Sequence, residues 1–250
     1  GDLDELGRIL AALGDLLGDG REALLVPLDA LGQVRGDLDG AVLDQELHTA
    51  RRIQESLVTP CPPDIPGFQL ALRLEPAFET GGDLLWVRRR SNGRWLAALG
   101  DVSGKGMAAA LYMSQAIALL EFATQRHDHG LEVILAQMDQ ALRQLFGLRD
   151  FLTLTLLEWG PDGQFRLARA GHPPAILVRG GQKVVDLSPG GRGLGLRPQG
   201  ACDWQIQEGR LEPRDWIVLY SDGLTEAMNR KGELYGECRM KTLLQRLWGP

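Results

Sequence analysis

The order of the apolar segments constrains the fold most, because two helical segments separate two groups of strands. Residues 106–125 are rich in Ala, Leu and Met and predict a helix that is apolar almost all round, and residues 131–146 have the spacing of an amphipathic helix. Runs typical of strands lie on both sides, at 68–74, 84–90, 95–100, 151–159, 165–170, 175–178 and 216–220. This order predicts an α+β domain of packed sheets and helices, with the 106–125 helix between layers.

A short turn, Ser91-Asn92-Gly93, separates two of the strand-like runs and predicts a tight hairpin. Arg88, Arg89, Arg90 and Arg94 concentrate positive charge at its tip. Such a tip could contact an acidic phosphoprotein, although a solvated hairpin end is the more common explanation.

Three carboxylates stand beside glycines at the ends of apolar runs. Asp101 lies in the run Gly-Asp-Val-Ser-Gly-Lys-Gly at 100–106, Asp83 follows two glycines, and Asp222 follows the apolar segment 216–220. A lone Asp beside Gly is usually a turn residue. Three in this setting predict a site lined by oxygen atoms, which favours Mg²⁺ or Mn²⁺. Zinc is disfavoured because the three cysteines, Cys61, Cys202 and Cys238, are scattered.

Composition sets the broad class. A chain of 250 residues with 44% apolar content can bury a full core, and its net charge of -6 gives little reason to expect nucleic acid. The unclustered cysteines fit the reducing cytoplasm. We expect no membrane-spanning run and no leader. The start at Gly1 without methionine suggests a piece of a longer protein, whose upstream part could hold an anchor in the inner membrane.

The N-terminal segment, residues 1–58, is predicted to be helical, and residues 59–250 to form the main domain. Leu43, Leu47, Ala50, Ile53 and Leu57 form an apolar seam with a period of about 3.5 residues. Residues 42–58 are therefore a candidate helix for a homodimer. Packing of the same helix on its own domain explains the seam equally well, and both alternatives stay open.

Five segments in order resemble the bacterial PPM-type (protein phosphatase 2C-like) metal-dependent serine/threonine phosphatases of the SpoIIE/RsbU family. They are ARRIQESL at 50–57, GGD at 81–83, GDVSGKG at 100–106, AGHPP at 170–174 and YSDGLTE at 220–226. The similarity covers most of the chain, from about residue 50 to residue 236.

This resemblance implies an αββα sandwich, in which two antiparallel sheets are flanked by helices, with two Mg²⁺ or Mn²⁺ ions between the sheets. Carried over by position, Asp101 would bridge the ions, the Val102 carbonyl would complete one site, Asp222 would hold the second ion, and Asp83 would bind a metal or orient its waters. The implied activity is hydrolysis of phosphoserine or phosphothreonine on a small STAS-type anti-sigma antagonist in a partner-switching pathway. Water would attack phosphorus directly, without a covalent enzyme intermediate.

Three further residues, His172, Lys105 and Glu226, each allow a functional and a structural interpretation. His172 could donate a proton to the leaving serine, but a histidine between glycine and two prolines more often orders a turn. Lys105 could attract phosphate or be a solvated lysine, and Glu226 could support the metal shell or be a charge at a helix end.

The chain departs from the family pattern near its end. The resemblance implies a final strand with an Asp-Asp pair, whereas no Asp follows Asp222. We expect that the domain lacks its C-terminal strand through truncation. The alternative is a pseudophosphatase that binds the regulator without turnover, and a third reading is a structural dimerisation scaffold. Asp4-Glu5-Leu6-Gly7 and the following Leu-rich run also resemble the second helix of a HAMP signal relay, which implies a membrane receptor as parent.

Overall fold

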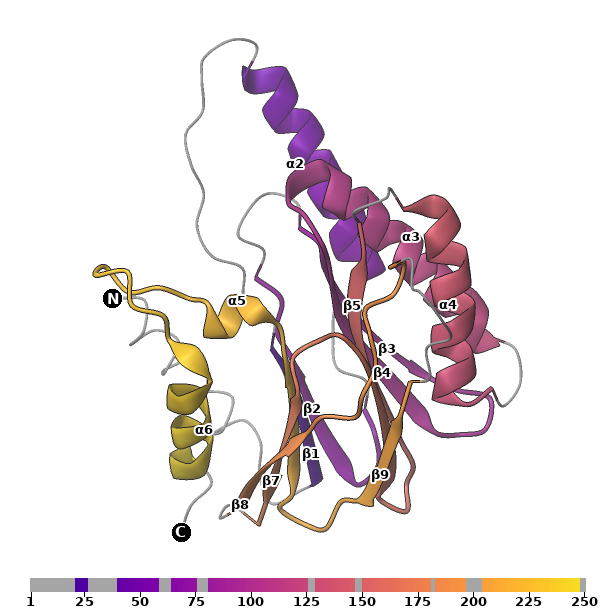
Figure 1. Ribbon diagram of the computed structural model, residues 1–250, viewed down its shortest axis with the longest axis vertical. Helices are drawn as coiled ribbons and strands as arrows, with labels where there is room; N and C mark the ends of the chain where they lie inside the picture. Colours follow the sequence, from indigo (N-terminus) through magenta and orange to yellow (C-terminus); the bar gives the residue numbers. More distant parts are fainter. Residues whose placement is uncertain are drawn as a thin grey trace.

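A computed structural model describes residues 21–26, 40–58, 64–75, 81–125, 129–146, 150–180, 183–196 and 204–247. The elements follow one another as β1 (Arg21–Val26), α2 (Gly40–Leu57), β2 (Phe68–Leu72), β3 (Asp83–Arg89), β4 (Trp95–Val102), α3 (Gly106–Gln125), α4 (Leu131–Leu145), β5 (Leu152–Trp159), β6 (Gln164–Ala170), β7 (Ala175–Arg179), β8 (Lys183–Leu187), β9 (Ile206–Arg210), β10 (Trp216–Tyr220), α5 (Asp222–Thr225) and α6 (Gly236–Leu247) (Figure 1).

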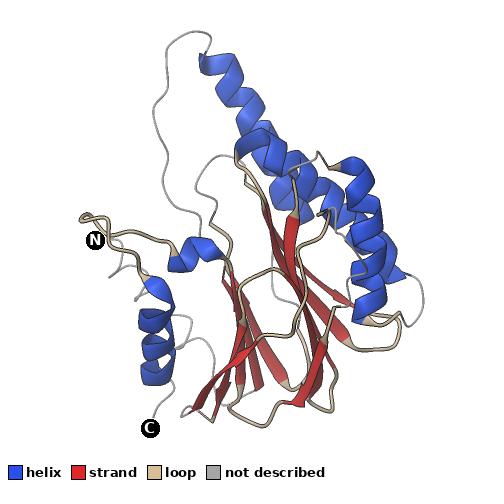
Figure 2. Ribbon diagram, in the orientation of Figure 1, coloured by secondary structure: helices blue, strands red, loops and turns tan. Residues whose placement is uncertain are grey.

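Two five-stranded sheets face each other between two layers of helices, which confirms the αββα sandwich (Figure 2). The first sheet has the order β2-β1-β10-β7-β8, and the second has the order β3-β4-β5-β6-β9. Every neighbouring pair in the second sheet is antiparallel. The first sheet departs from antiparallel pairing only around β1, which runs parallel to both of its neighbours.

Alternation along the strands divides the core into layers. In β3 and β4, Leu85, Val87, Ala97 and Leu99 point inward and pack between the two sheets. Their neighbours in the sequence, such as Leu84, Trp86, Leu96 and Ala98, point to the other face and pack under α3 and α4. A third apolar cluster lies between the first sheet and α6, where Met240 and Leu244 cover β7 and β10.

Helix α3 is long and apolar enough to cross a membrane by length and composition, so the expectation that no segment reaches that length was wrong. One face of this helix packs on the second sheet and beside α4, through residues such as Met113 and Leu120. The opposite face is open, since Met107, Leu111 and Phe122 are exposed. The prediction that α3 lies between layers was therefore wrong, because α3 belongs to an outer layer of helices that covers one sheet.

The predicted helical segment 1–58 is helical only in part of what the structure describes. Residues 40–57 form α2, as expected, but residues 21–26 form β1, so the helix prediction was wrong there. A short apolar run bounded by a Gly-rich stretch and a proline is as typical of a strand as of a helix. Residues 1–20 and 27–39, which include the HAMP-like motif, lie outside the described residues.

The seven predicted strands and the hairpin are confirmed with small shifts at their ends. Gly93 takes a left-handed backbone conformation, φ +80°, and its N–H donates to the Arg90 carbonyl at 3.0 Å, which closes the turn. Strands β8 and β9 were missed. Each lies at a sheet edge and is partly exposed, so neither carries the apolar pattern of a central strand.

Two leucines on α3 test the assignment of its faces. Replacing Leu120, which is fully buried, by Ala should lower the free energy of unfolding by about 2–5 kcal/mol, because it removes packing and leaves a cavity. The same substitution at Leu111, which is 59% exposed, should change it by no more than about 0.5 kcal/mol. Urea denaturation measures both, and equal losses would contradict the assignment.

Candidate metal centre

Asp83 and Asp101 lie directly opposite each other in the β3–β4 ladder. Residues in this relation have Cβ atoms roughly 5 Å apart and project from the same face of the sheet. That face is the inner one, because Leu85 and Leu99, two residues along each strand, pack between the sheets. Asp83 is buried and Asp101 is half-buried. The ladder therefore places two carboxylates side by side at the edge of the space between the sheets.

Gly82 lets the backbone pass close to the oxygen atoms of Asp101 and Val102. A Cβ atom at position 82 would lie 2.7 Å from the Val102 carbonyl oxygen and 2.8 Å from Oδ1 of Asp101, closer than such contacts allow. The Val102 N–H donates to the Gly82 carbonyl at 3.2 Å, which fixes this approach. A carboxylate oxygen and a carbonyl oxygen thus lie side by side at a point where no side chain fits at position 82.

Asp222 reaches the site from the first sheet. It is the first residue of α5, separated from the end of β10 by Ser221 alone, and it is exposed. Asp222 and Asp101 line one cleft of about 690 Å³, whereas Asp83, opposite Asp101 in the ladder, is not part of its wall. The cleft is mixed in charge, with Lys105, Arg169, Glu226 and Glu237 as the other ionisable side chains of its walls, besides His172.

The oxygen atoms of this site meet only some of the requirements for binding a hard cation such as Mg²⁺. Within the described ranges, no three His, Cys, Asp or Glu side chains come together in a group that could hold a metal. The structure brings Asp83 and Asp101 together and sets Asp222 at the same cleft, but not within one cluster. Mg²⁺ is commonly bound through one or two carboxylates plus waters, so Asp101, the Val102 carbonyl and Asp83 fit such an ion.

His172 is buried at the back of the cleft, and its Nδ1 lies 2.9 Å from the Thr153 hydroxyl. Burial lowers the pKa of His172 to about 3; the Tyr220 backbone opposes this shift and the charge of Arg169 adds to it. Thr153 also donates to the Asp101 carbonyl at 3.2 Å. A buried, neutral imidazole that contacts the support of Asp101 favours the structural role over proton donation.

The turn that carries His172 is held by Arg169. Its guanidinium donates to the His172 carbonyl at 2.8 Å and to the Pro189 carbonyl at 3.1 Å.

Lys105 is exposed just before α3, and the N–H of Glu226 donates to the Asp222 carbonyl at 2.7 Å, at the end of α5. Arg169 and Lys105 therefore add positive charge to a cleft that the carboxylates make acidic.

Helix α2 contacts the glycines before Asp83. The Gln54 side chain donates to the Gly81 carbonyl at 2.9 Å and accepts from the Gly81 N–H at 3.2 Å. Gln54 lay within a segment that the sequence singled out, but its role there was not predicted. The pairing joins residues far apart in the sequence, so only the fold reveals it.

Asp139 on α4 holds a second segment that supports the site, a loop that follows β8. It is buried on α4 and accepts hydrogen bonds from Arg192 at 2.8 Å and from the Gly195 N–H at 2.9 Å. Arg192 and Gly195 belong to the loop before the end of the described segment 183–196. In this loop the Gly191 carbonyl accepts a hydrogen bond from the Gly171 N–H, and Leu194 pairs with Leu152 of β5. Asp139 therefore holds a loop that contacts both the histidine turn and the strand of Thr153, and no sequence motif pointed to Asp139.

The two-sheet sandwich with acidic residues at one end of the ladder defines a protein with the PP2C-like fold. The chain belongs to the SpoIIE family, because the family profile described as stage II sporulation protein E matches residues 91–249, more than half of its length. This membership confirms the resemblance found in the sequence.

Two curated relatives are similar to this chain in sequence. Phosphoserine phosphatase RsbU of Bacillus subtilis is 28% identical over 77% of this chain and 57% of its own length. Protein IcfG of Synechocystis sp. is 22% identical over 80% of this chain and 35% of its own length. The chain thus spans between about a third and three fifths of the length of these relatives.

Solved structures share the fold. The SiaA-PP2C domain of Pseudomonas aeruginosa superposes with a TM-score of 0.65 at 22% identity, over 83% of this chain and 84% of that one. The RsbU and RsbW domains of Rv1364c from Mycobacterium tuberculosis give a TM-score of 0.54 at 26% identity, over 65% of this chain and 44% of that one.

The depressed pKa of His172 predicts a pH dependence of stability. Its folded pKa, about 3, lies below the ordinary 6.5, so the unfolded chain binds the proton first. The stability that His172 contributes is present above pH 6.5 and is lost as the pH falls toward 3. His172→Gln should therefore flatten the fall in unfolding free energy over this range, measured by urea denaturation at several pH values. His48→Gln, on the exposed side of α2, is the matched control. An unchanged fall in His172→Gln would contradict the prediction.

Proposed function

We propose that this chain is a metal-dependent protein serine/threonine phosphatase. The observation that carries the proposal is the pairing of Asp83 with Asp101 next to Gly82, at a cleft that Asp101 and Asp222 line, in a member of the SpoIIE family. A relative named as a phosphoserine phosphatase supports the same activity.

Each residue has a defined part in this proposal. Asp101, the Val102 carbonyl and Asp83 would hold one Mg²⁺ or Mn²⁺ ion, and Asp222 and Asp101 would hold a second. The ions, when bound, would lower the pKa of a water and neutralise charge on the phosphoryl group. Lys105 and Arg169 attract the phosphate to the cleft by charge. Thr153 fixes the backbone of Asp101 through its hydrogen bond to the Asp101 carbonyl.

We infer that the substrate is a small phosphorylated regulator of the STAS type in a partner-switching pathway. The support is the similarity to RsbU and to a chain in which an RsbU domain occurs together with an RsbW domain. The cleft also suits a protein surface, because it opens between the end of one ladder and the start of α5 rather than as a closed chamber.

A pseudophosphatase remains the second candidate, and one observation favours it. Among the described residues no three acidic, histidine or cysteine side chains converge on one metal position. A chain of this kind would bind the phosphorylated regulator and release it unchanged.

Hydrolysis of an aryl phosphate and of a phosphoserine peptide with Mn²⁺ separates the two candidates. Asp101→Ala should lower metal-dependent kcat/KM at least about a hundredfold, because loss even of a group that supports a ligand costs 10- to 100-fold. Asp162→Ala removes an exposed carboxylate in the β5–β6 turn and should leave the rate unchanged. Binding of the phosphopeptide without turnover by the wild-type chain would favour the pseudophosphatase.

We also propose that α2 mediates a homodimer. The helix extends beyond the sandwich (Figure 1), and Ile53 on its seam is 57% exposed, whereas Leu57 packs against the core under α3. Leu57, at the end of the seam near the sheet, thus packs within its own domain, whereas Ile53 is available for contact with a second copy of the chain.

Ile53→Glu should therefore convert a dimer to a monomer, because it places a charge in an apolar interface. Ser56→Glu adds the same charge at an exposed position of the same helix and is the control. Light scattering coupled to size exclusion measures the mass of each variant. A dimer in both variants would place the interface elsewhere.

A further inference from the structure

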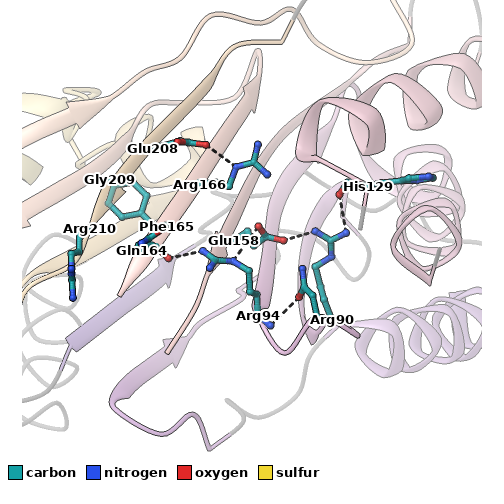
Figure 3. A pocket seen from close by; sticks show the side chains of 11 residues that line it. Arg90, Arg94, His129, Glu158, Gln164, Phe165, Arg166, Glu208, Gly209 and Arg210 are labelled. Atoms are coloured by element: carbon teal, nitrogen blue, oxygen red, sulfur yellow. Dashed lines mark hydrogen bonds and ion pairs between the residues drawn. The ribbon is translucent and has the colours of Figure 1, made fainter. Parts of the chain in front are cut away.

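A second cavity, of about 670 Å³, lies at the end of the β3–β4 ladder opposite to Asp83 and Asp101 (Figure 3). The hairpin tip, the β5–β6 turn region and the edge strand β9 supply its walls. Six ladder steps separate Asp83 from Arg89, so the two sites are roughly 20 Å apart along the strands. The cavity is therefore distinct from the metal centre.

Two arginines share one buried glutamate at the bottom of this cavity. Arg90 and Glu158 are both buried and form a hydrogen-bonded ion pair, and Arg94 lies 3.3 Å from the second oxygen of Glu158 (Figure 3). Arg90 also donates to the His129 carbonyl at 2.8 Å, and Arg94 donates to the Gln164 carbonyl at 2.8 Å. Two guanidinium groups for one carboxylate leave an excess positive charge in a fixed position.

The walls add cations that are less firmly held. Arg166 pairs with Glu208 at 3.0 Å, and the Glu208 side chain is 67% exposed. The Arg210 side chain is 61% exposed, and its nearest carboxylate, on Glu212, is 4.0 Å away. Exposed pairs of this kind contribute little to stability, so an incoming carboxylate can replace Glu208 at small cost.

The cavity walls thus carry four arginines and two glutamates in a chain whose net charge is -6. Three more carboxylates lie near the walls, since Glu132 is 3.8 Å from Arg166, Asp162 is 3.9 Å from Arg94 and Glu212 is 4.0 Å from Arg210. All three side chains are about half exposed or more and lie outside the walls. The walls themselves remain positive.

We propose that this cavity is a docking site for an acidic peptide segment of a partner protein. Its arginines already bind carboxylates, on Glu158 and Glu208, so their geometry suits side chains of Asp or Glu. Its volume far exceeds that of one small anion, and its walls extend from the hairpin tip to the sheet edge. Docking here needs neither metal nor turnover, because the cavity is separate from the cleft.

Fluorescence anisotropy of a labelled hexaglutamate peptide tests the proposal on the full chain. The titration is made at low ionic strength in EDTA, where bound metal makes no contribution at the cleft. The wild-type chain should bind hexaglutamate and not hexaserine, and added salt should weaken the binding. Arg166→Gln and Arg210→Gln should each raise Kd about two- to fivefold, and the double variant about tenfold.

Arg246→Gln removes an equal charge from the exposed end of α6 and should leave Kd unchanged. Aryl phosphate hydrolysis should be the same in all of these variants, so failure of docking can be told apart from failure of the phosphatase. Equal Kd values in the double variant and in Arg246→Gln would overturn the proposal. Absence of hexaglutamate binding would also overturn it, as would binding of inorganic phosphate alone.

Discussion

The register of β3 against β4 is the constraint on which the site depends. A slip of one residue would turn every side chain of β3 to the opposite face, because the period of a strand is two. Asp83 would then leave the space between the sheets, and Leu84 would take its place there. The hairpin at Gly93 and the inward residues Leu85 and Val87 therefore fix the carboxylates as firmly as they fix the core.

Much of the fold could be predicted because its central strands are covered on both faces. The strand runs and the Asn-Gly turn have local signals, and both appear in the structure. The edge strands β8 and β9 lack such signals because solvent replaces one layer of packing. The open face of α3 was missed for a related reason, since apolar composition alone does not say which face has a partner.

The residues of the candidate site also differ in whether a local sequence signal marks them. Asp83, Asp101 and Asp222 were predicted from glycines beside them in the sequence, a local signal. Their supports, Gln54 and Asp139, act through hydrogen bonds to residues 27 and more than 50 positions away. No local pattern reports such a contact, because it exists only after the sheets and helices have packed.

One support also shows how a change outside the sandwich would reach the carboxylates. The double hydrogen bond between Gln54 and the backbone of Gly81 joins α2 to the chain two residues before Asp83. Asp83 in turn lies directly opposite Asp101 in the β3–β4 ladder. A shift of α2 along or about its axis would therefore strain this bond. Leu57, at the end of α2, packs against the core, so this anchor and the Gln54 bond lie in the same last turns of the helix.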